Sequence, residues 1–107
     1  MSDYVVLFCT CCNETEARQI AEALVESRLA ACVNLLRGIQ SVYRWEGQVE
    51  TAHEVLLIVK SRAEHFDALQ TRITELHSYT IPEIIALPIT AGSEKYLNWI
   101  REETAAG

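Results

Sequence analysis

The stretch Ser41-Val42-Tyr43-Arg44-Trp45-Glu46-Gly47-Gln48-Val49 joins two long runs of residues that favour β-strands, with Glu46-Gly47 at the junction. Gly47 provides the backbone freedom of a tight turn, so residues 32–46 and 49–61 are predicted to form one long hairpin. A strand of about 15 residues at about 3.3 Å each runs roughly 50 Å, whereas a compact chain of this size is about 33 Å across. The hairpin is therefore expected to bend or project, and Gly38 is the expected position of a bulge.

Strands and helices are predicted on both sides of the hairpin. Residues 4–10 and 83–90 are apolar runs typical of strands. Amphipathic helices are expected after Asn13, over residues 64–77, and after Ser93. The order of these elements predicts an α+β fold, a ferredoxin-like βαββαβ sandwich with a long β-hairpin and an added C-terminal helix.

Two details of this pattern concern capping and burial. Asn13 is expected to be the N-cap of the first helix, with Glu16 as the second half of a capping box. The run Val55-Leu56-Leu57-Ile58-Val59 is apolar without alternation, which indicates an interior strand that is covered on both faces.

Composition limits the class of protein. The chain has 107 residues, of which 50% are hydrophobic, so residues 1–107 are expected to form a single domain. The formal charge is -6 and there is no basic run, which argues against nucleic acid as a partner. The N-terminal apolar run is too short for a signal sequence or a membrane span. We therefore expect a cytoplasmic protein whose four cysteines are reduced.

The projecting hairpin has a consequence for assembly. Val42, Tyr43, Trp45 and Val49 near its tip would expose apolar area and unpaired strand edges to water. We therefore expect another subunit to cover this surface, so the sequence predicts a homo-oligomer.

The segment between the second helix and the last strand carries the residues most suited to a site. Pro82 cannot continue a helix and favours extended geometry at Ile81. This places His77, Tyr79 and Glu83 around one helix-to-strand corner. An ordinary solvated corner is the alternative interpretation of these three residues.

Several segments of the chain, in order, resemble the CutA divalent-cation tolerance family. They are Val6-Leu7-Phe8-Cys9-Thr10, Leu29-Ala30-Ala31-Cys32-Val33-Asn34, Ser41-Val42-Tyr43-Arg44-Trp45-Glu46-Gly47, residues 54–60, and the corner from His77-Ser78-Tyr79 to Pro82-Glu83. The resemblance covers almost the whole chain. It implies a ferredoxin-like homotrimer, similar in architecture to the PII signalling proteins, with hairpins packed between subunits and clefts at the subunit boundaries.

The resemblance also implies binding of copper or another divalent cation. Cys9 and His77 match family positions and, with Glu83, are the candidate metal ligands, because sulfur and imidazole donors favour copper or zinc. The alternatives are that Cys9 is a small buried hydrophobe and that His77 bonds the last carbonyls of its helix. Leu76 stands where some relatives have a second histidine, and Ser78 stands where proline is common.

Further polar and aromatic positions match the family and would lie at a subunit boundary. By analogy with the PII-like architecture, they could hold a small anionic or cationic ligand in an intersubunit cleft. The candidates are Tyr43, Trp45, Glu54, Lys60, Tyr79 and Glu83. Alternatively, Lys60 pairs with Glu54 or Glu83, and the aromatic residues of the hairpin are interface anchors.

The run Cys9-Thr10-Cys11-Cys12 contains a C-x-x-C spacing just before a predicted helix N-terminus, where relatives usually have a proline and an acidic residue. The helix dipole would favour thiolates there, so Cys11 and Cys12 are candidates for assisting metal binding or thiol exchange. Against exchange, two cysteines at a strand end can point to opposite faces of the sheet.

These observations together predict a homotrimeric cation-binding protein that contributes to metal-ion tolerance, without enzymatic turnover. The principal alternative is a PII-like sensor that binds a small molecule in the intersubunit cleft and signals to a partner protein. A thiol oxidoreductase is the third hypothesis.

Overall fold

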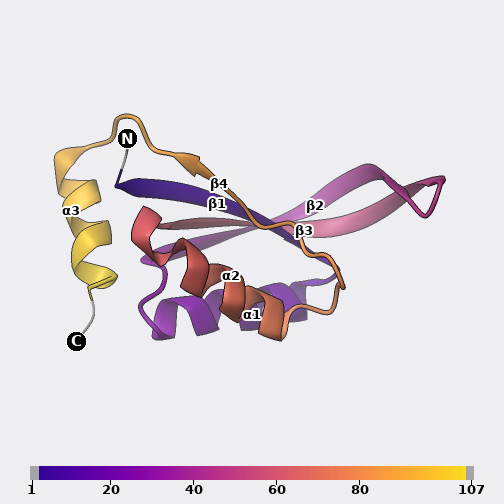
Figure 1. The fold of residues 1–107 in the computed structure, drawn as a ribbon, viewed down its shortest axis with the longest axis horizontal. Coiled ribbons are helices and arrows are strands. Elements are labelled where there is room, and N and C mark those ends of the chain that lie inside the picture. Colours follow the sequence, from indigo (N-terminus) through magenta and orange to yellow (C-terminus); the bar gives the residue numbers. More distant parts are fainter. Residues whose placement is uncertain (1–2, 106–107) are drawn as a thin grey trace.

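Four strands form one antiparallel sheet in the computed structural model, which describes residues 3–105 (Figure 1). The order across the sheet is β2-β3-β1-β4. The strands are β1 (Tyr4–Cys11), β2 (Cys32–Trp45), β3 (Gln48–Arg62) and β4 (Ile85–Pro88). The helices are α1 (Glu14–Glu26), α2 (Phe66–Leu76) and α3 (Glu94–Glu103), with a short 3-10 turn at Ala63–His65. The predicted α+β ferredoxin-like fold with an added C-terminal helix is confirmed.

The long hairpin projects from the rest of the molecule, as the length of its strands requires (Figure 1). Glu46 and Gly47 join β2 to β3 with φ values of 49° and 78°, the left-handed pair that a tight hairpin turn needs. The register of the two strands shifts between Leu36 and Ile39, where Gly38 has a φ of 77°. The predicted bulge is therefore present, and the molecule measures 44 × 25 × 23 Å along its principal axes.

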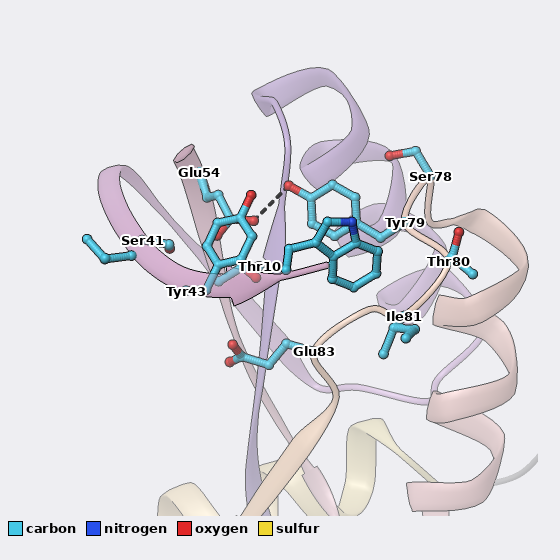
Figure 2. A pocket seen from close by; sticks show the side chains of 11 residues that line it. Thr10, Ser41, Tyr43, Glu54, Ser78, Tyr79, Thr80, Ile81 and Glu83 are labelled. Carbon is cyan, nitrogen blue, oxygen red and sulfur yellow. Dashed lines mark hydrogen bonds between the residues drawn. The ribbon is translucent and has the colours of Figure 1, made fainter. Parts of the chain in front are cut away.

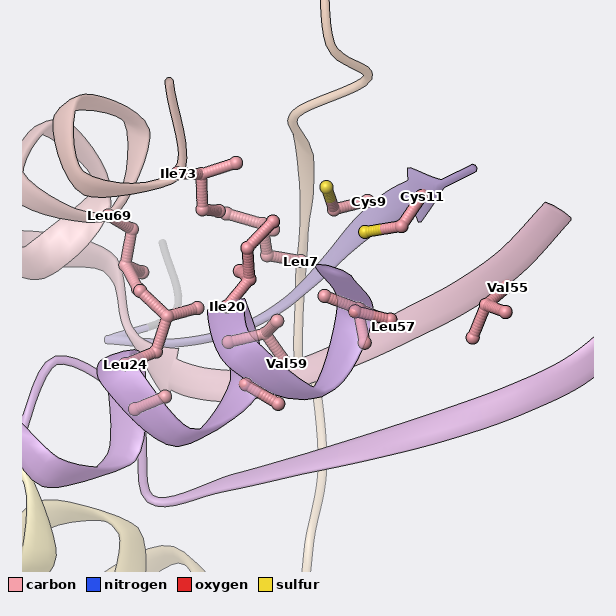
Figure 3. Close-up of a cluster of buried hydrophobic side chains, with 13 residues drawn as sticks. Leu7, Cys9, Cys11, Ile20, Leu24, Val55, Leu57, Val59, Leu69 and Ile73 are labelled. Atoms are coloured by element: carbon pink, nitrogen blue, oxygen red, sulfur yellow. The ribbon is translucent and has the colours of Figure 1, made fainter. Parts of the chain in front are cut away.

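Helices α1 and α2 cover one face of the sheet and enclose the main core (Figures 1 and 3). Strand β1 alternates regularly, so every second side chain from Val5 to Cys11 is buried against these helices. The fully buried side chains of the core include Leu7, Ile20, Leu24, Leu57, Val59, Leu69 and Ile73. Burying each large aliphatic side chain contributes about 1.5–3 kcal/mol.

The opposite face of the sheet is less covered. The prediction that residues 55–59 form an interior strand is confirmed, because β3 lies between β2 and β1. On its second face, however, Leu56 and Ile58 are only half-buried within the described chain. Large apolar side chains are exposed along the hairpin and β4, namely Leu36, Val42, Tyr43, Trp45, Val49, Ile85 and Leu87.

Some predicted boundaries and contacts were wrong. The last strand covers Ile85–Pro88 rather than residues 83–90, because the chain turns the corner until residue 84 and, beyond Pro88, one hydrogen bond from the Ile89 N–H to the Tyr4 carbonyl oxygen ends the contact with β1. The second helix begins with the 3-10 turn and ends at Leu76, so His77 is its extended C-cap. No helix within residues 3–105 is both long and apolar enough to span a membrane.

The helix caps follow the sequence closely. Asn13 accepts a hydrogen bond from the Glu16 N–H at 2.8 Å, and Ser93 accepts one from the Tyr96 N–H at 3.1 Å. The Glu16 side chain does not complete the predicted capping box among the described residues. Its carboxylate accepts a hydrogen bond from the backbone N–H of Ser78 instead, which ties the start of α1 to the corner after α2.

Candidate functional site

Cys9, Cys11 and His77 form a buried cluster where β1 meets the end of α2. Their ligand atoms all lie within 4.8 Å of one another, and their residues are 0%, 0% and 8% exposed. Residues two apart on a strand share a face, so Cys9 and Cys11 both point toward the helices (Figure 3). This is the one group of three or more potential metal-ligating side chains within residues 3–105.

Two hydrogen bonds fix the His77 ring and its tautomer. Nε2 lies 2.7 Å from the Thr10 carbonyl oxygen, which can only accept, so Nε2 carries the proton. Nδ1 accepts the backbone N–H of Tyr79 at 3.0 Å. His77 is therefore a neutral imidazole, and a metal ion must displace one of these two hydrogen bonds to gain a ring nitrogen as ligand.

The thiol of Cys9 is held in its protonated form. A hydrogen bond with Cys11 raises the pKa of the Cys9 thiol far above its ordinary value of 9.0, and burial raises it further. The negative charges of Glu83 and Glu16 act in the same direction. A cation has to replace these thiol protons in order to bind, and its positive charge would offset the surrounding negative charges.

The donor set of the cluster fits a soft or borderline metal ion. Two sulfur atoms and one imidazole nitrogen are typical ligands of copper and zinc, whereas magnesium and calcium prefer oxygen. Cys9 and Cys11 lie on strand β1 and His77 is the C-cap of α2, where Oε2 of Glu16 lies 3.8 Å from Nδ1 of His77. The residues present therefore suit copper or zinc.

The C-x-x-C pair is separated by the fold. Cys9 is buried, whereas Cys12 is exposed beyond the end of β1, where its Sγ lies 3.6 Å from Ser78 Oγ. All four cysteines are free. The fold places the thiols of Cys9 and Cys11 on the same buried face, as the C-x-C spacing on a strand requires.

A cleft with a volume of about 710 Å³ lies next to this cluster, between the hairpin and the corner after α2 (Figure 2). This volume is in the range of small-molecule sites. The lining residues are Thr10, Ser41, Val42, Tyr43, Trp45, Glu54, Ser78, Tyr79, Thr80, Ile81 and Glu83.

One hydrogen bond crosses the cleft. The Tyr79 hydroxyl donates to Oε2 of Glu54 at 2.7 Å, and Glu54 is only 8% exposed (Figure 2). Burial raises the pKa of the Tyr79 phenol well above its ordinary value, and the hydrogen bond to Glu54 raises it further. Tyr79 thus remains a neutral donor. Its ring also contacts His77, with the two centroids 4.7 Å apart.

The structure groups five of the six predicted ligand-binding residues in the cleft and separates one. Tyr43, Trp45, Glu54, Tyr79 and Glu83 line it together.

Lys60 is not among the lining residues. Its ammonium group donates to the Asn34 side chain and lies 3.9 Å from Cys32 Sγ, and it makes no ion pair with Glu54 or Glu83 among the described residues. Glu83 lines the cleft but is not a member of the cysteine–histidine cluster.

Comparison with known proteins finds relatives that match nearly the whole chain. Residues 5–103 match the family model of the CutA1 divalent ion tolerance protein. The divalent-cation tolerance protein CutA of Thermus thermophilus is 52% identical over 99 residues, which cover 92% of this chain and 96% of that protein. Protein CutA of Homo sapiens is 45% identical and covers 91% of this chain, but the match spans only 54% of the human protein.

Solved structures agree with these sequence matches. The divalent cation tolerance protein Cut A1 from Thermus thermophilus superposes with a TM-score of 0.93 at 50% identity, covering 95% of this chain and 99% of that one. CutA from Xylella fastidiosa superposes with a TM-score of 0.95 at 43% identity, and the match covers 97% of this chain and 100% of the Xylella chain.

Proposed function

Because the chain belongs to the CutA1 divalent ion tolerance family, we propose that it binds copper or another divalent cation and thereby contributes to metal-ion tolerance, without enzymatic turnover. The observation that carries this proposal is the buried cluster of Cys9, Cys11 and His77, whose ligand atoms lie within 4.8 Å of one another. The names of the relatives link them to divalent-cation tolerance, and the cluster offers the donors for such an ion.

The donor chemistry narrows the choice of ion. Two thiols and an imidazole suit copper, including Cu(I), and zinc, whereas an oxygen-rich site would be needed for magnesium or calcium. Binding would convert Cys9 and Cys11 to thiolates and would shift the ring of His77 away from the Thr10 carbonyl or the Tyr79 N–H. The site therefore connects ion binding to the corner that borders the cleft.

The test is a titration of metal-free, reduced protein with Cu(I), Cu(II) and Zn(II), beside the variants Cys9→Ser and His77→Ala. The proposal predicts stoichiometric, tight binding that both variants weaken. Binding that ignores both substitutions would contradict it and would make the tolerance role of the family an indirect one for this chain.

The protein acts as a homotrimer in this proposal, located in the cytoplasm, where thiols stay reduced. The exposed apolar side chains of the hairpin and β4, such as Val42 at 70% and Leu87 at 47%, support an assembly that covers them. Light scattering should then give three times the chain mass of 12.1 kDa. A mass of 12.1 kDa at micromolar concentration would contradict assembly.

The second candidate function is a PII-like sensor that binds a small molecule and signals to a partner protein. The cleft of about 710 Å³ favours it, because it gathers three aromatic side chains and two carboxylates on the hairpin and the corner. Melting in the presence of candidate ligands tests this role, because a ligand of the folded protein alone raises its melting temperature.

A further inference from the structure

The charged side chains that line the cleft beside the cysteine–histidine cluster are all negative. The lining contains the carboxylates of Glu54 and Glu83 and no lysine or arginine. Neither carboxylate forms an ion pair with a basic side chain among residues 3–105. An anionic ligand such as a nucleotide or a carboxylic acid would therefore meet negative charge without a compensating cation.

Glu54 is the more buried of the two carboxylates. It is 8% exposed, and a buried carboxylate normally has a cationic partner or several hydrogen bonds. Tyr79 donates to Oε2, and this is the one side-chain hydrogen bond of Glu54 within residues 3–105. Because no buried side-chain oxygen of these residues lacks a partner, Oε1 is accessible, and the Glu54 side chain lines the cleft with this acceptor.

The walls of the cleft suit an organic group attached to a cation. Tyr43 and Tyr79 bring aromatic rings to the same space as the two carboxylates (Figure 2). Trp45 lines the same cleft as a third aromatic residue. Aromatic faces attract ammonium groups and also pack against alkyl chains. Ser41 and Thr80 line the cleft too, and a hydroxyl group can accept a hydrogen bond from an ammonium group.

A bare metal ion fits this space poorly. A cavity of about 710 Å³ is far larger than one ion, and Glu54 and Glu83 belong to no group of three potential metal ligands within residues 3–105. The cysteine–histidine cluster, by contrast, brings its ligand atoms within 4.8 Å of one another. The cysteine–histidine cluster therefore suits a metal ion, whereas the cleft suits a larger, organic ligand.

We infer that the cleft binds an alkylammonium cation, whose ammonium group is hydrogen-bonded by Glu54 and whose alkyl part packs on Tyr43, Trp45 and Tyr79. This inference rests on the second candidate function and specifies the class of its ligand. Glu83 supplies additional negative charge at the exposed side of the cleft.

Isothermal titration of the metal-free protein of residues 1–107 in its assembled state tests the inference. The probes are n-pentylammonium, its quaternary analogue pentyltrimethylammonium, and pentanoate as the anion of matched length. Pentylammonium should bind with saturation at one site per chain, more tightly than the quaternary cation, which cannot donate hydrogen bonds. Pentanoate should show no saturable binding.

Variants locate the site. Glu54→Gln keeps an acceptor for Tyr79 but removes the charge, so it should weaken pentylammonium binding about 10-fold or more. Glu83→Gln should weaken pentylammonium binding to a smaller degree. Because Glu83 is exposed, this variant should fold normally and therefore tests the charge of the cleft even if Glu54→Gln fails to fold. Glu50→Gln is the matched control, because Glu50 is an exposed residue of the same strand outside the lining.

The outcomes separate the two levels of the hypothesis. Pentanoate binding that Trp45→Ala abolishes would overturn the cation assignment and leave the cleft as a ligand site. No saturable binding of any probe would overturn both the inference and the sensor role, as expected if a neighbouring subunit fills the cleft. Equal affinity of wild type, Glu54→Gln and Glu83→Gln would also overturn the inference. The Cu(I) affinity of Glu54→Gln, measured in parallel, should equal that of wild type, because the cysteine–histidine cluster does not include Glu54.

Discussion

Tyr79 holds His77 in two ways: its backbone N–H donates to Nδ1 of His77 at 3.0 Å, and the centroids of the two rings lie 4.7 Å apart. The hydroxyl of the same tyrosine donates to Glu54 across the cleft. One residue therefore contacts both the proposed metal ligand and the proposed ligand-binding carboxylate. A metal ion that takes Nδ1 of His77 must displace the Tyr79 N–H, which would disturb the border of the cleft.

The first prediction concerns the cysteine that the family resemblance did not indicate. Cys11→Ser should lower Cu(I) or Zn(II) affinity by about 10-fold or more, because even the loss of groups that only orient metal ligands costs about 10–100-fold. Competition titration against a chromophoric chelator measures the effect. Cys12→Ser is the matched control and should leave affinity unchanged, since its exposed thiol lies outside the cluster. The reverse ranking of these variants would remove Cys11 from the site.

The second prediction concerns pH and the metal-free protein. The raised pKa of Cys9 means that the folded chain retains this proton above pH 9.0, whereas the unfolded chain loses it. The folded state then binds more protons, so the free energy of unfolding falls as pH rises above about 9. Urea denaturation at about pH 8 and pH 10 should show a smaller fall for Cys9→Ala than for wild type. Identical falls would contradict a protonated Cys9.

The third prediction concerns the hydrogen bond across the cleft. Tyr79→Phe keeps the aromatic contact with His77 but leaves the buried Glu54 carboxylate without its donor. The free energy of unfolding should fall by about 1–3 kcal/mol. Chemical denaturation checks this value, with Tyr43→Phe as the control within about 0.5 kcal/mol of wild type because Tyr43 is exposed. Equal stabilities of the two variants would show that the Glu54 contact contributes little.

The fourth prediction concerns the bend of the hairpin. Gly38 has a φ of 77° and no atom within 4 Å of an added Cβ, so a substitution there meets backbone strain without steric crowding. Gly38→Ala should destabilise the fold by about 1–2 kcal/mol, and Gly38→Asn by less, because asparagine tolerates left-handed geometry better. Thermal and urea denaturation measure both. An alanine variant as stable as wild type would imply that the bulge relaxes.

Local sequence signals were sufficient for most of the fold. The Glu46–Gly47 turn, the bulge at Gly38 and the cap at Asn13 each depend on a few adjacent residues, and the structure has all three. The length of β4 was overestimated, because Ile84 and Ile89 continue an apolar pattern, whereas the paired register with β1 covers Ile85–Pro88 and Ile89 adds one hydrogen bond to Tyr4. Apolar character alone does not reveal where an edge strand stops pairing.

The candidate sites depended on contacts distant in sequence. The side chain of Glu16 supports Ser78, 62 positions away, rather than its own helix start, and no local pattern specifies that choice. Lys60 matched a family position but bonds Asn34 on the neighbouring strand. Cys11 was predicted as an assisting ligand beside Cys12, and period-two alternation could have placed it on the same face as Cys9. Its proximity to His77 required the packing of α2 against the sheet.

We propose that two sulfur atoms and one imidazole nitrogen bind the ion. X-ray absorption spectroscopy of the protein loaded with one equivalent of Zn(II) tests this ligand set most directly. The account predicts a spectrum with two sulfur scatterers at about 2.3 Å and a histidine nitrogen at about 2.0 Å, with the sulfur contribution halved in Cys11→Ser. A first shell made only of oxygen and nitrogen, unchanged by that substitution, would contradict the assignment of the buried cluster as the metal site.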